Sequence, residues 1–329
     1  MKVHYFFRQF HQHQTSIEKL FNIIIPAVEK NNVVTKHVEN KYDFTLKGIL
    51  STLFFFHKNQ GEINHITGDI HWAILGVKRD RTILTIHDLV GMVQLRGLKK
   101  KIYYLFWIYF PIKKAKYITV ISPKSKDEIL KYFPDAADKI TVIPNCLTIE
   151  AAPLILNKNN PVSRILIIGT RHNKNIDRIF KSLIGITCEL EIVGELSDEQ
   201  KKFLHENRFT FQNVSKVSEE ELLQVYDRSD ILCFPSLYEG FGLPILEAQA
   251  RNCAVITSNI SPMKEVAGEA AELVDPESVE EIRNAVLMLI NDREKRAELI
   301  TRGHENIKKY SKEKIAEQYI EIYRKIAKV

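Results

Sequence analysis

The stretch that decides the fold is Asp230–Ser258, DILCFPSLYEGFGLPILEAQARNCAVITS. It begins with an apolar run, ILCF, that ends at Pro235, and it closes with a second run, AVITS. Between them, Pro244 precedes good helix formers, and proline is favoured at the first position of a helix. The order is strand, loop, helix, strand, which is the unit of a parallel sheet with helical crossovers.

The same alternation extends through most of the chain. Downstream of residue 163, further strands are predicted at RILIIG, which ends at Gly169, and CELEIVG, which ends at Gly194, with helices such as 218–230 and 279–290 between strands. The first half is predicted to hold strands VHYFF (3–7), TILTI (82–86), YITVI (117–121) and ITVI (140–143), with a helix from a Thr15–Glu18 capping box and another from Ser122 and Pro123.

A break in this pattern divides the chain. PNCLTIEAAPLILNKNNPV (144–162) carries three prolines and four asparagines and has weak periodicity, which is typical of a linker. With 329 residues and about 150 residues per domain, we predict an α/β protein with two Rossmann-like domains, 1–147 and 148–311, and a last helix over 312–329. No sequence repeat is visible.

Ligands of such sheets bind outside the carboxyl ends of the strands. This rule selects the residues just past the strands: His87, the segment Gly169 to Lys174, Gly194, and the segment Ser236 to Gly242.

The loop after ILCF has the composition of an anion site. Its glycines allow close backbone approach, and the start of the following helix points N–H groups outward. Those amides belong to Gly240, Phe241, Gly242 and Leu243. Glu239 precedes them and Glu247 follows about one turn into the helix, so both carboxylates can accept sugar hydroxyls in one pocket. Spacing alone equally fits a solvated Glu239 and a Glu247 that only favours the helix dipole.

The loop after RILIIG offers two cations, Arg171 and Lys174, before a helix near Asn175. Such a pair can clamp a diphosphate, although a solvated loop is equally consistent. No G-x-G-x-x-G fingerprint or Walker loop accompanies it.

Histidines give a weak metal signal. His87 and His65 each lie at a strand end, where a structural role is more common than a catalytic one. His11 and His13 lack an acidic neighbour, and no D-x-D occurs in the chain. We therefore expect no metal site and no cofactor.

Charge is unevenly divided. Residues 1–150 hold 22 Lys and Arg against 13 Asp and Glu, a net +9, whereas residues 151–329 hold 25 against 28, a net −3. The first half therefore favours an anionic partner. RGLKKKIYYLFWIYFPIKKAKYI (96–118) fits either a helix on an anionic membrane or a core helix with solvated ends.

The chain also carries signals of its compartment. The longest apolar run, 102–112, has 11 residues, short of the about 20 that span a membrane. The N-terminus lacks a signal peptide. The four cysteines form no C-x-x-C pair, and Cys233 and Cys253 fit core positions. We expect a cytoplasmic protein, in peripheral contact with the inner face of a membrane.

Residues 235–276, PSLYEGFGLPILEAQARNCAVITSNISPMKEVAGEAAELVDP, closely resemble the signature of retaining glycosyltransferases of family four, the glycogen synthase–mannosyltransferase type. IIGTRHNKNIDRI, IVGEL, TIHDL and TVIPN match further family segments in order. The resemblance runs from about residue 63 onward. It implies the GT-B fold, in which two Rossmann-like domains face each other across a cleft and the last helix crosses back to the N-terminal domain.

The resemblance also implies residue roles. Glu239 would contact the donor sugar near the reacting carbon, and Glu247 would hold the ribose of the nucleotide. Lys174 with Arg171 would bind the diphosphate, and His87 would touch the sugar from the N-terminal domain. Sugar and phosphate would meet backbone groups around Phe241, Gly242 and Leu243, and the strand-end glycines Gly169 and Gly194 would line the same site.

Three positions depart from the family pattern. Asn173 stands where many relatives have arginine, and Cys146 follows Asn145 where glycine is common. The usual glycine-rich loop after the first strand is replaced by FRQFHQHQ, which leaves the contacts of Arg8 to Gln14 open.

The expected activity is retaining transfer of a hexose from a UDP- or GDP-sugar to a glycan or polyprenyl-linked acceptor in bacterial surface polysaccharide synthesis. No metal and no nucleic acid is expected to take part. Two alternatives stay open: a non-catalytic sugar-nucleotide-binding subunit of a glycan assembly complex, and a GT-B epimerase.

Overall fold

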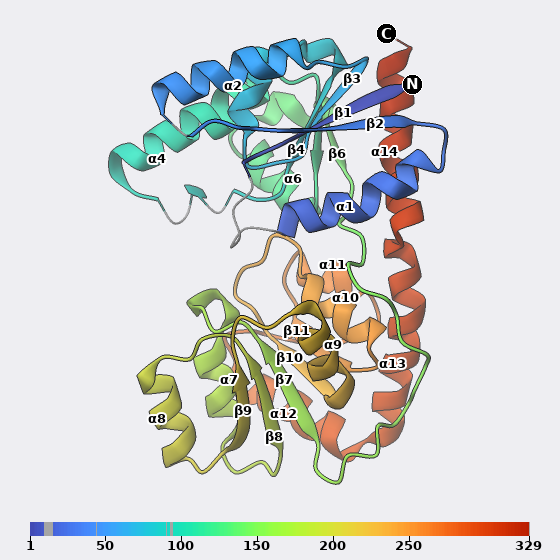
Figure 1. The fold of residues 1–329 in the computed structure, drawn as a ribbon. Helices are drawn as coiled ribbons and strands as arrows, with labels where there is room; N and C mark the ends of the chain where they lie inside the picture. Colours follow the sequence, from blue (N-terminus) through green and yellow to red (C-terminus); the bar gives the residue numbers. More distant parts are fainter. Residues whose placement is uncertain (10–15, 44, 90, 93–94, 329) are drawn as a thin grey trace. The chain divides into compact units, whose positions relative to one another are not determined.

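The computed structural model describes residues 1–9, 16–43, 45–89, 91–92 and 95–328. The chain forms two compact units, one of residues 1–148 with 310–329 and one of residues 149–309 (Figure 1). Both are built from a parallel sheet with helices on its faces. Every helix in the described part of the chain falls short of the length and apolar character that a membrane span requires.

The N-terminal unit contains a six-stranded sheet in the order β2-β1-β3-β4-β5-β6, with every pair parallel. Its strands are β1 Lys2–Phe7, β2 Val34–Glu39, β3 Ile63–Ile66, β4 Thr82–Ile86, β5 Tyr117–Val120 and β6 Ile140–Val142. The strand order reverses between β1 and β3, and such a switch point opens a crevice at the carboxyl ends of the strands.

Helices cover both faces of this sheet. They are α1 Ser16–Glu29, α2 Leu46–Lys58, α4 Gly97–Tyr103, α5 Phe110–Lys114, α6 Pro123–Leu130 and α14 Lys312–Ala327, with a π-helical segment η3 Tyr104–Tyr109 and 3₁₀ turns η1 His71–Gly76, η2 Arg79–Arg81 and η4 Pro134–Lys139. Side chains of β1 alternate between faces: Tyr5 packs with α1 and α14, whereas Phe6 packs in the core beneath η1 and α5. Ser122 caps α6 as predicted.

The last helix, α14, packs on the N-terminal unit, as the fold class implied. It contacts α1, and the Tyr323 hydroxyl lies 2.7 Å from His65 Nδ1 and 3.0 Å from the Tyr5 hydroxyl. His65 Nε2 lies 2.7 Å from Thr85 Oγ1, so both ring nitrogens are used inside the core. The structural interpretation of His65 is therefore confirmed.

The C-terminal unit contains the second six-stranded parallel sheet, in the order β12-β11-β10-β7-β8-β9. Its strands are β7 Arg164–Ile168, β8 Glu189–Val193, β9 Thr210–Val214, β10 Ile231–Phe234, β11 Ala254–Ser258 and β12 Glu272–Val274. Its helices are α7 Ile176–Leu183, α8 Asp198–Glu206, α9 Glu219–Arg228, α10 Leu243–Ala250, α11 Met263–Ala267, α12 Val279–Asn291 and α13 Arg293–Ile307, with 3₁₀ turns η5 His172–Lys174 and η6 Lys308–Tyr310.

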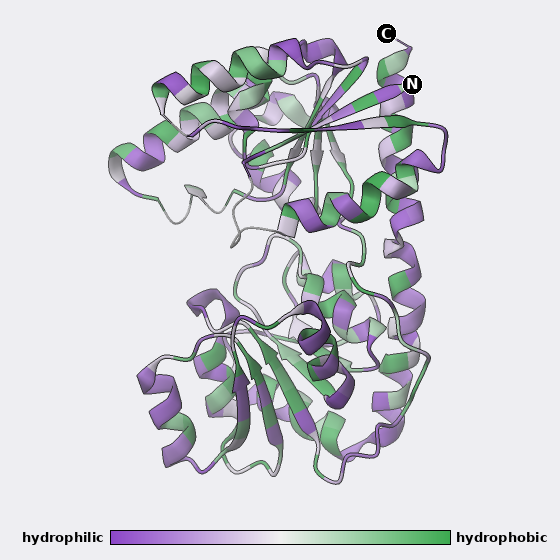
Figure 2. Cartoon of the chain, viewed as in Figure 1, coloured by the Kyte–Doolittle hydropathy of each residue, from purple (hydrophilic) through white to green (hydrophobic). Residues whose placement is uncertain are grey.

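Polarity follows burial in this unit. Alternate side chains of the central strands β7, β8 and β10 are buried in one cluster with α7 and α12. The peripheral helices α8 and α9 are mostly hydrophilic (Figure 2), and each begins with a complete capping box, from Ser197 and Ser218. All four cysteines are buried and free, and Cys233 and Cys253 lie in the core, as predicted.

The predicted linker, 144–162, contains no helix or strand. It is nevertheless fastened along the C-terminal unit. Lys158 Nζ donates to the carbonyls of Tyr226, Ser229 and Arg251 at 2.8, 2.6 and 2.8 Å. The Asn252 side chain bonds to the backbone of Pro153 and Ile155. The linker is thus a fixed strap across the ends of α9 and α10.

Candidate active site

The loop between β10 and α10, residues 235–242, has the predicted glycine turn. Gly242 has φ 109°, a conformation that strongly favours glycine, and it caps α10. The helix begins at Leu243, so Pro244 takes its second position instead of the predicted first. Phe241 is buried and Gly240 half-buried. The backbone N–H groups at this helix start form the electropositive end of α10.

The loop between β7 and α7, residues 169–175, is tied to the β10–α10 loop by two asparagines. Asn173 Nδ2 donates to the Tyr238 carbonyl at 3.1 Å, and its own carbonyl accepts from the Leu237 amide at 2.8 Å. Asn175 has φ 62°, and its Nδ2 donates to the Pro235 and Pro276 carbonyls at 3.0 and 2.6 Å. The two loops predicted to bind one ligand are therefore held side by side.

Lys174 and Glu239 meet between these loops. Lys174 Nζ donates to Glu239 Oε1 at 2.6 Å and lies 4.5 Å from the centre of the Phe234 ring. Their side chains are 19% and 13% exposed, so the pair is shielded from most of the solvent. Attraction between opposite charges is stronger there than in open water.

Gly169 makes room for the lysine. Its φ is +87°, and a Cβ atom at this position would lie 2.9 Å from Lys174 Cγ. Gly194 plays a similar part after β8, because a Cβ there would lie 2.8 Å from Thr170 Cγ2. Thr170 Oγ1 in turn donates to the Glu195 carbonyl at 2.6 Å. Both glycines therefore let neighbouring loops approach at the carboxyl edge of the sheet.

Glu247 is buried in α10, with 8% of its surface exposed. The hydroxyl of Tyr226, a fully buried residue of α9, donates to Glu247 Oε2 at 2.8 Å. Burial and the neighbouring carboxylate both raise the pKa of Tyr226 well above its usual value, so the hydroxyl stays protonated and keeps donating. The hydroxyl of Tyr226 thus holds the Glu247 carboxylate in place within α10.

Arg171 is exposed at the start of η5. The cation that the structure places against Glu239 is Lys174, at 2.6 Å. Its proposed role at the diphosphate stays a prediction.

His87 lies in the N-terminal unit, where the chain leaves β4. Its Nε2 is 2.8 Å from the Thr67 carbonyl. A carbonyl only accepts, so this nitrogen carries the proton and Nδ1 is the acceptor in the neutral ring. Burial lowers the pKa of His87 below its usual value, which favours the neutral ring. Gly68, with φ +135°, leaves room for this ring, since a Cβ there would be 2.5 Å from His87 Cδ2.

Arg8 is held inside the N-terminal unit by two carboxylates. Its Nε donates to Glu18 Oε1 at 2.8 Å, and Nη1 donates to Asp69 Oδ2 at 2.5 Å. Gln9 is half-buried, whereas positions 10–14 of this loop and Thr15 of the predicted capping box lie outside the described residues.

Metal ligands do not gather in groups of three or more among the described His, Cys, Asp and Glu side chains. His11 and His13 lie outside those residues. Independence from a metal and from a cofactor remains a prediction.

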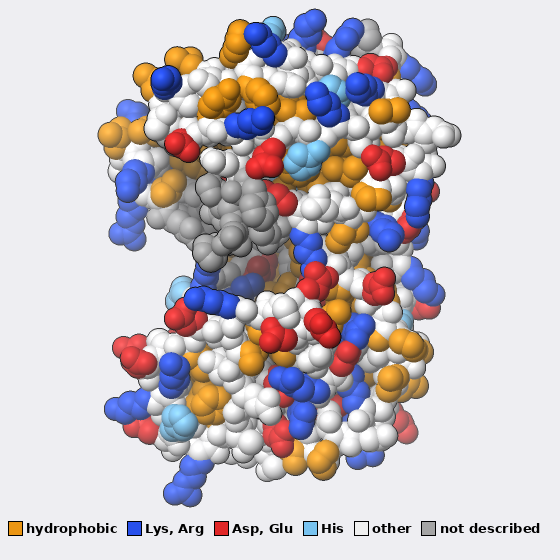
Figure 3. Space-filling model, in the orientation of Figure 1, with side chains coloured by type: hydrophobic (Ala, Val, Ile, Leu, Met, Phe, Trp, Pro, Cys, Tyr) orange, Lys and Arg blue, Asp and Glu red, His pale blue; other side chains and the backbone are white. Residues whose placement is uncertain are grey.

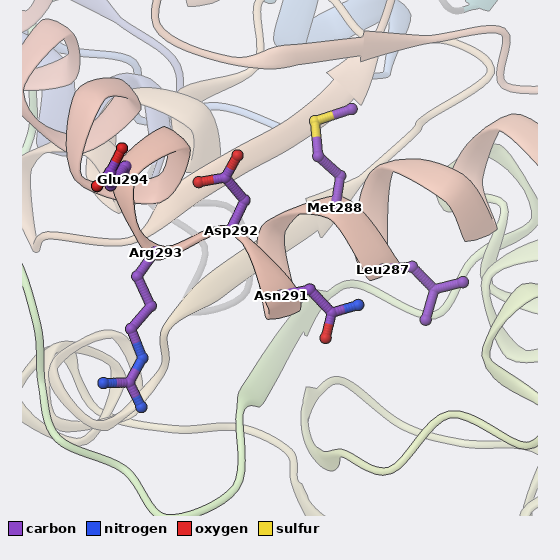
Figure 4. Close-up of a pocket in the computed structure, with 6 residues that line it drawn as sticks. All are labelled: Leu287, Met288, Asn291, Asp292, Arg293 and Glu294. Atoms are coloured by element: carbon purple, nitrogen blue, oxygen red, sulfur yellow. The ribbon is translucent and has the colours of Figure 1, made fainter.

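A shallow hollow of about 660 Å³ lies at the junction of α12 and α13. Figure 4 shows its lining, Leu287 to Glu294, at the end of one helix and the start of the next. Asp292 caps α13 there by accepting from the Lys295 amide at 2.8 Å. In an α/β unit the helices run back against the strands, so this hollow lies at the amino edge of the sheet, away from Lys174 and Glu239.

Comparison with known proteins supplies the family. A sequence model of glycosyl transferases group 1 matches residues 147–306, and a model of glycosyltransferase family 4 matches residues 36–151. The chain belongs to the group 1, family 4 glycosyltransferases. Both sheets and both candidate loops lie largely inside the matched residues, and the resemblance stated from the motifs is confirmed.

Two similar family members are O-antigen mannosyltransferases. The O-antigen chain mannosyltransferase RfbU of Salmonella typhimurium is 27% identical over 63% of this chain and 60% of its own length. O-antigen chain mannosyltransferase B of Escherichia coli is 27% identical over 74% of this chain and 70% of its own length. The chain thus spans well under the full length of these relatives.

The fold is shared with solved glycosyltransferase structures. Sucrose-phosphate synthase from Thermosynechococcus elongatus superposes with a TM-score of 0.75 over 99% of both chains, at 16% identity. At this identity the likeness establishes the fold alone. It confirms the predicted α/β, GT-B class.

Three site residues escaped prediction from the sequence. Tyr226 gave no signal, because a tyrosine on the buried side of an amphipathic helix is an ordinary core residue. Asn173 was noticed only as a departure from the family pattern, and Asn175 only as the start of a helix. Their hydrogen bonds to distant loops depend on the folded backbone.

Proposed function

We propose that this chain is a retaining glycosyltransferase that transfers a hexose from a nucleotide-diphosphate sugar to a glycan or lipid-linked acceptor. The observation that carries the proposal is the Lys174–Glu239 pair, 2.6 Å apart and mostly buried, beside the N-terminus of α10. A lysine and a helix start favour a diphosphate, and a carboxylate next to them favours sugar hydroxyls.

The proposed reaction breaks the bond between the anomeric carbon and the diphosphate oxygen and forms one to the acceptor oxygen on the same face. The leaving diphosphate takes the electron pair and the acceptor's proton. Lys174, with Arg171, stabilises the negative charge that develops on the leaving group. Glu239 positions the sugar, whose transition state is oxocarbenium-like as in glycoside hydrolysis.

We assign Glu247 to the ribose. Its carboxylate is held by Tyr226 at 2.8 Å, which leaves it oriented before a ligand arrives. The neutral His87, with Nδ1 as an acceptor, suits a hydroxyl of the donor sugar. Backbone groups of Gly240, Phe241, Gly242 and Leu243 complete the phosphate and sugar contacts in this proposal.

Mannose is the sugar we favour, because both relatives named above are O-antigen mannosyltransferases. The same names support surface polysaccharide synthesis as the process. We place the protein in the cytoplasm, in peripheral contact with the inner face of the membrane.

The test is a nucleotide-release assay of the purified protein with UDP-, GDP- and ADP-sugars, with and without lipid-linked acceptors. We expect nucleotide to be released from a GDP- or UDP-hexose only when an acceptor is present. The anomeric configuration of the sugar in the product should be the same as in the donor. Glu239→Ala should abolish transfer while the circular dichroism spectrum and melting temperature stay near those of the wild type. Full activity of this variant would exclude the assignment.

The same assay separates the alternatives. A non-catalytic subunit would bind nucleotide sugar without consuming it, and an epimerase would act on the donor with no acceptor present. Lys174→Ala should weaken UDP or GDP binding, whereas Lys201→Ala, on the exposed side of α8, should leave it unchanged.

A further inference from the structure

Helix α2 of the N-terminal unit exposes a stripe of large apolar side chains. Leu46, Leu50 and Phe54 recur every four residues and are 77%, 61% and 61% exposed. The opposite side of the helix, with Thr52 and Phe56, is buried. A surface helix normally turns such a stripe toward the core, so α2 is apolar on both sides.

A second exposed stripe runs along residues 97–114, where α4, η3 and α5 form one continuous helical rod. Leu98, Ile102, Phe106 and Phe110 are exposed at intervals of four residues. The wider π-helical turn of η3 keeps residues four apart closer to one line than an α-helix of 3.6 residues per turn would.

This rod takes part in the core of the unit on one side, where Tyr103, Tyr104 and Trp107 pack against the buried cluster. Only Ile108, Pro111 and Ile112 are buried in it. The aromatic block therefore divides between a narrow buried side and the exposed stripe.

The two stripes lie on neighbouring elements of the unit. Both α2 and α5 pack on η1, which lies between them. Figure 3 shows hydrophobic and basic side chains interspersed over α2 and α4. We call these seven exposed apolar residues, together with Lys58, Lys99, Lys100 and Lys101, the α2–α4 face.

The two chain segments that carry this face are strongly basic in sequence, and Lys116 is paired with Asp80 at 3.5 Å. Between Asp88 and Asp127 the chain has nine Lys and Arg and no Asp or Glu, and between Asp43 and Glu62 it has two lysines and no acid. Lys58 Nζ lies 4.4 Å from the centre of the exposed Phe54 ring. Lysines that border apolar side chains can keep their ammonium groups at a polar boundary while the stems lie in an apolar layer.

We propose that the α2–α4 face binds the surface of an anionic lipid bilayer. Apolar side chains enter the boundary between headgroups and acyl chains, and the lysines meet lipid phosphates, as for amphipathic helices that lie in a membrane surface. A second copy of this chain would bring the same positive charges together, and the core of a protein interface is depleted of lysine. The inference deepens the proposed function, since a lipid-linked acceptor would be met at this surface.

The experiment is flotation of the full chain with phosphatidylcholine vesicles, with and without phosphatidylglycerol. We expect binding to the anionic vesicles at low salt and release at high salt, because the Debye length falls as salt rises. Changing Lys99, Lys100 and Lys101 to Gln should weaken partitioning by about a hundredfold, given roughly fivefold per basic residue near the surface. Changing Leu46, Leu50 and Phe54 to Ser should weaken it by at least about tenfold at unchanged charge.

Matched controls lie in the C-terminal unit. Leu154, Ile155 and Leu156 are 49%, 48% and 45% exposed, so their triple Ser variant removes comparable apolar surface elsewhere. Lys201 and Lys202 on α8 are exposed lysines whose Gln variants remove charge elsewhere. Neither control should change vesicle binding by more than about twofold, since surface changes away from the face are energetically small.

The proposal would be overturned if the wild type did not float at low salt or bound neutral vesicles equally well. It would also be overturned if the control variants lost as much vesicle binding as the variants of the α2–α4 face. A wild-type dimer in light scattering that the α2 variant dissociates would instead identify a second copy of the chain as the partner. Release of nucleotide with a water-soluble acceptor is measured on the same variants. If the wild type releases nucleotide but does not float with the vesicles, only the membrane role of the α2–α4 face is rejected. If the wild type floats but neither it nor any variant releases nucleotide, only the enzymatic proposal is rejected.

Discussion

Lys174 and Glu239 are each other's partners before a ligand is present, and this has a consequence for binding. The lysine proposed for the diphosphate is neutralised by the carboxylate proposed for the sugar, at 2.6 Å. Donor binding must therefore share or replace this ion pair. The affinity for a nucleoside diphosphate and the ability to transfer sugar should respond in opposite directions when the carboxylate loses its charge.

Glu239→Gln tests this opposition. It removes the negative charge but keeps the shape, so UDP or GDP should bind about threefold to tenfold tighter, because a neighbouring anion worth about 1 kcal/mol is gone. Transfer should fall to background. Isothermal titration calorimetry gives the affinity, and weaker nucleotide binding by this variant would contradict the opposition.

Tyr226→Phe tests the assignment of Glu247 to the ribose. The variant removes the donor of a 2.8 Å hydrogen bond to a buried carboxylate, so affinity for UDP or GDP should fall by about tenfold, a loss typical of a hydrogen bond to a charged group. The effect should be smaller for a 2′,3′-dideoxynucleotide, which lacks the hydroxyls. Equal losses for both nucleotides would place the ribose elsewhere.

Among the elements, the strap of residues 144–162 shows what amino-acid composition can and cannot predict about a segment. Its prolines and asparagines correctly predicted a segment without helix or strand. They could not predict that it is fixed, because Lys158 finds three carbonyls at the ends of α9 and α10, which the folded unit alone brings together.

Lys158→Met should lower the free energy of unfolding by about 3 kcal/mol, since the charged donor is lost and its carbonyls stay partly buried. Urea denaturation followed by circular dichroism measures this loss. Lys202→Met, on exposed α8, serves as the control and should change little. A strap variant as stable as this control would show that the contacts of Lys158 contribute nothing to folding.

Strands were predicted where burial makes them apolar. The apolar runs in the sequence predicted β7, β10 and β11, whereas no strand was predicted at β2, β3, β9 or β12. β2 and β9 lie at sheet edges and are largely exposed, and β3 places Asn64 and His65 in the core. Apolar runs carry no information about such strands, whose positions depend on their neighbours in the sheet.

At the scale of the whole molecule, α14 joins the end of the chain to the first sheet through His65. Burial lowers the pKa of His65 to about 3. Between that value and the usual 6.5 the unfolded chain binds the proton and the folded one does not. The free energy of unfolding should therefore rise with pH up to about 6.5. Above that pH, His65 should contribute no further pH dependence.

From pH 6.5 down to pH 5, His65 should cost about 2 kcal/mol of stability. Urea denaturation of the wild type and of His65→Gln across this range measures the difference in slope. The variant should lose most of the pH dependence. Identical slopes would show that another group controls the acid limit.

Much of the candidate site was visible in the sequence because parallel sheets place strand ends together. Gly169, Lys174, Gly194 and Glu239 follow from that rule. The hydrogen bonds that fix them, from Asn173, Asn175 and Tyr226, join residues far apart in the chain and needed the structure.

The central claim is that the C-terminal unit binds a nucleotide sugar through Lys174, Glu239 and Glu247. The most direct measurement is a crystal structure of the full chain with the donor that the release assay selects. We predict that Lys174 contacts the diphosphate, Glu239 the sugar and Glu247 the ribose hydroxyls. A donor bound away from the β7–α7 and β10–α10 loops, with the Lys174–Glu239 pair undisturbed, would contradict it.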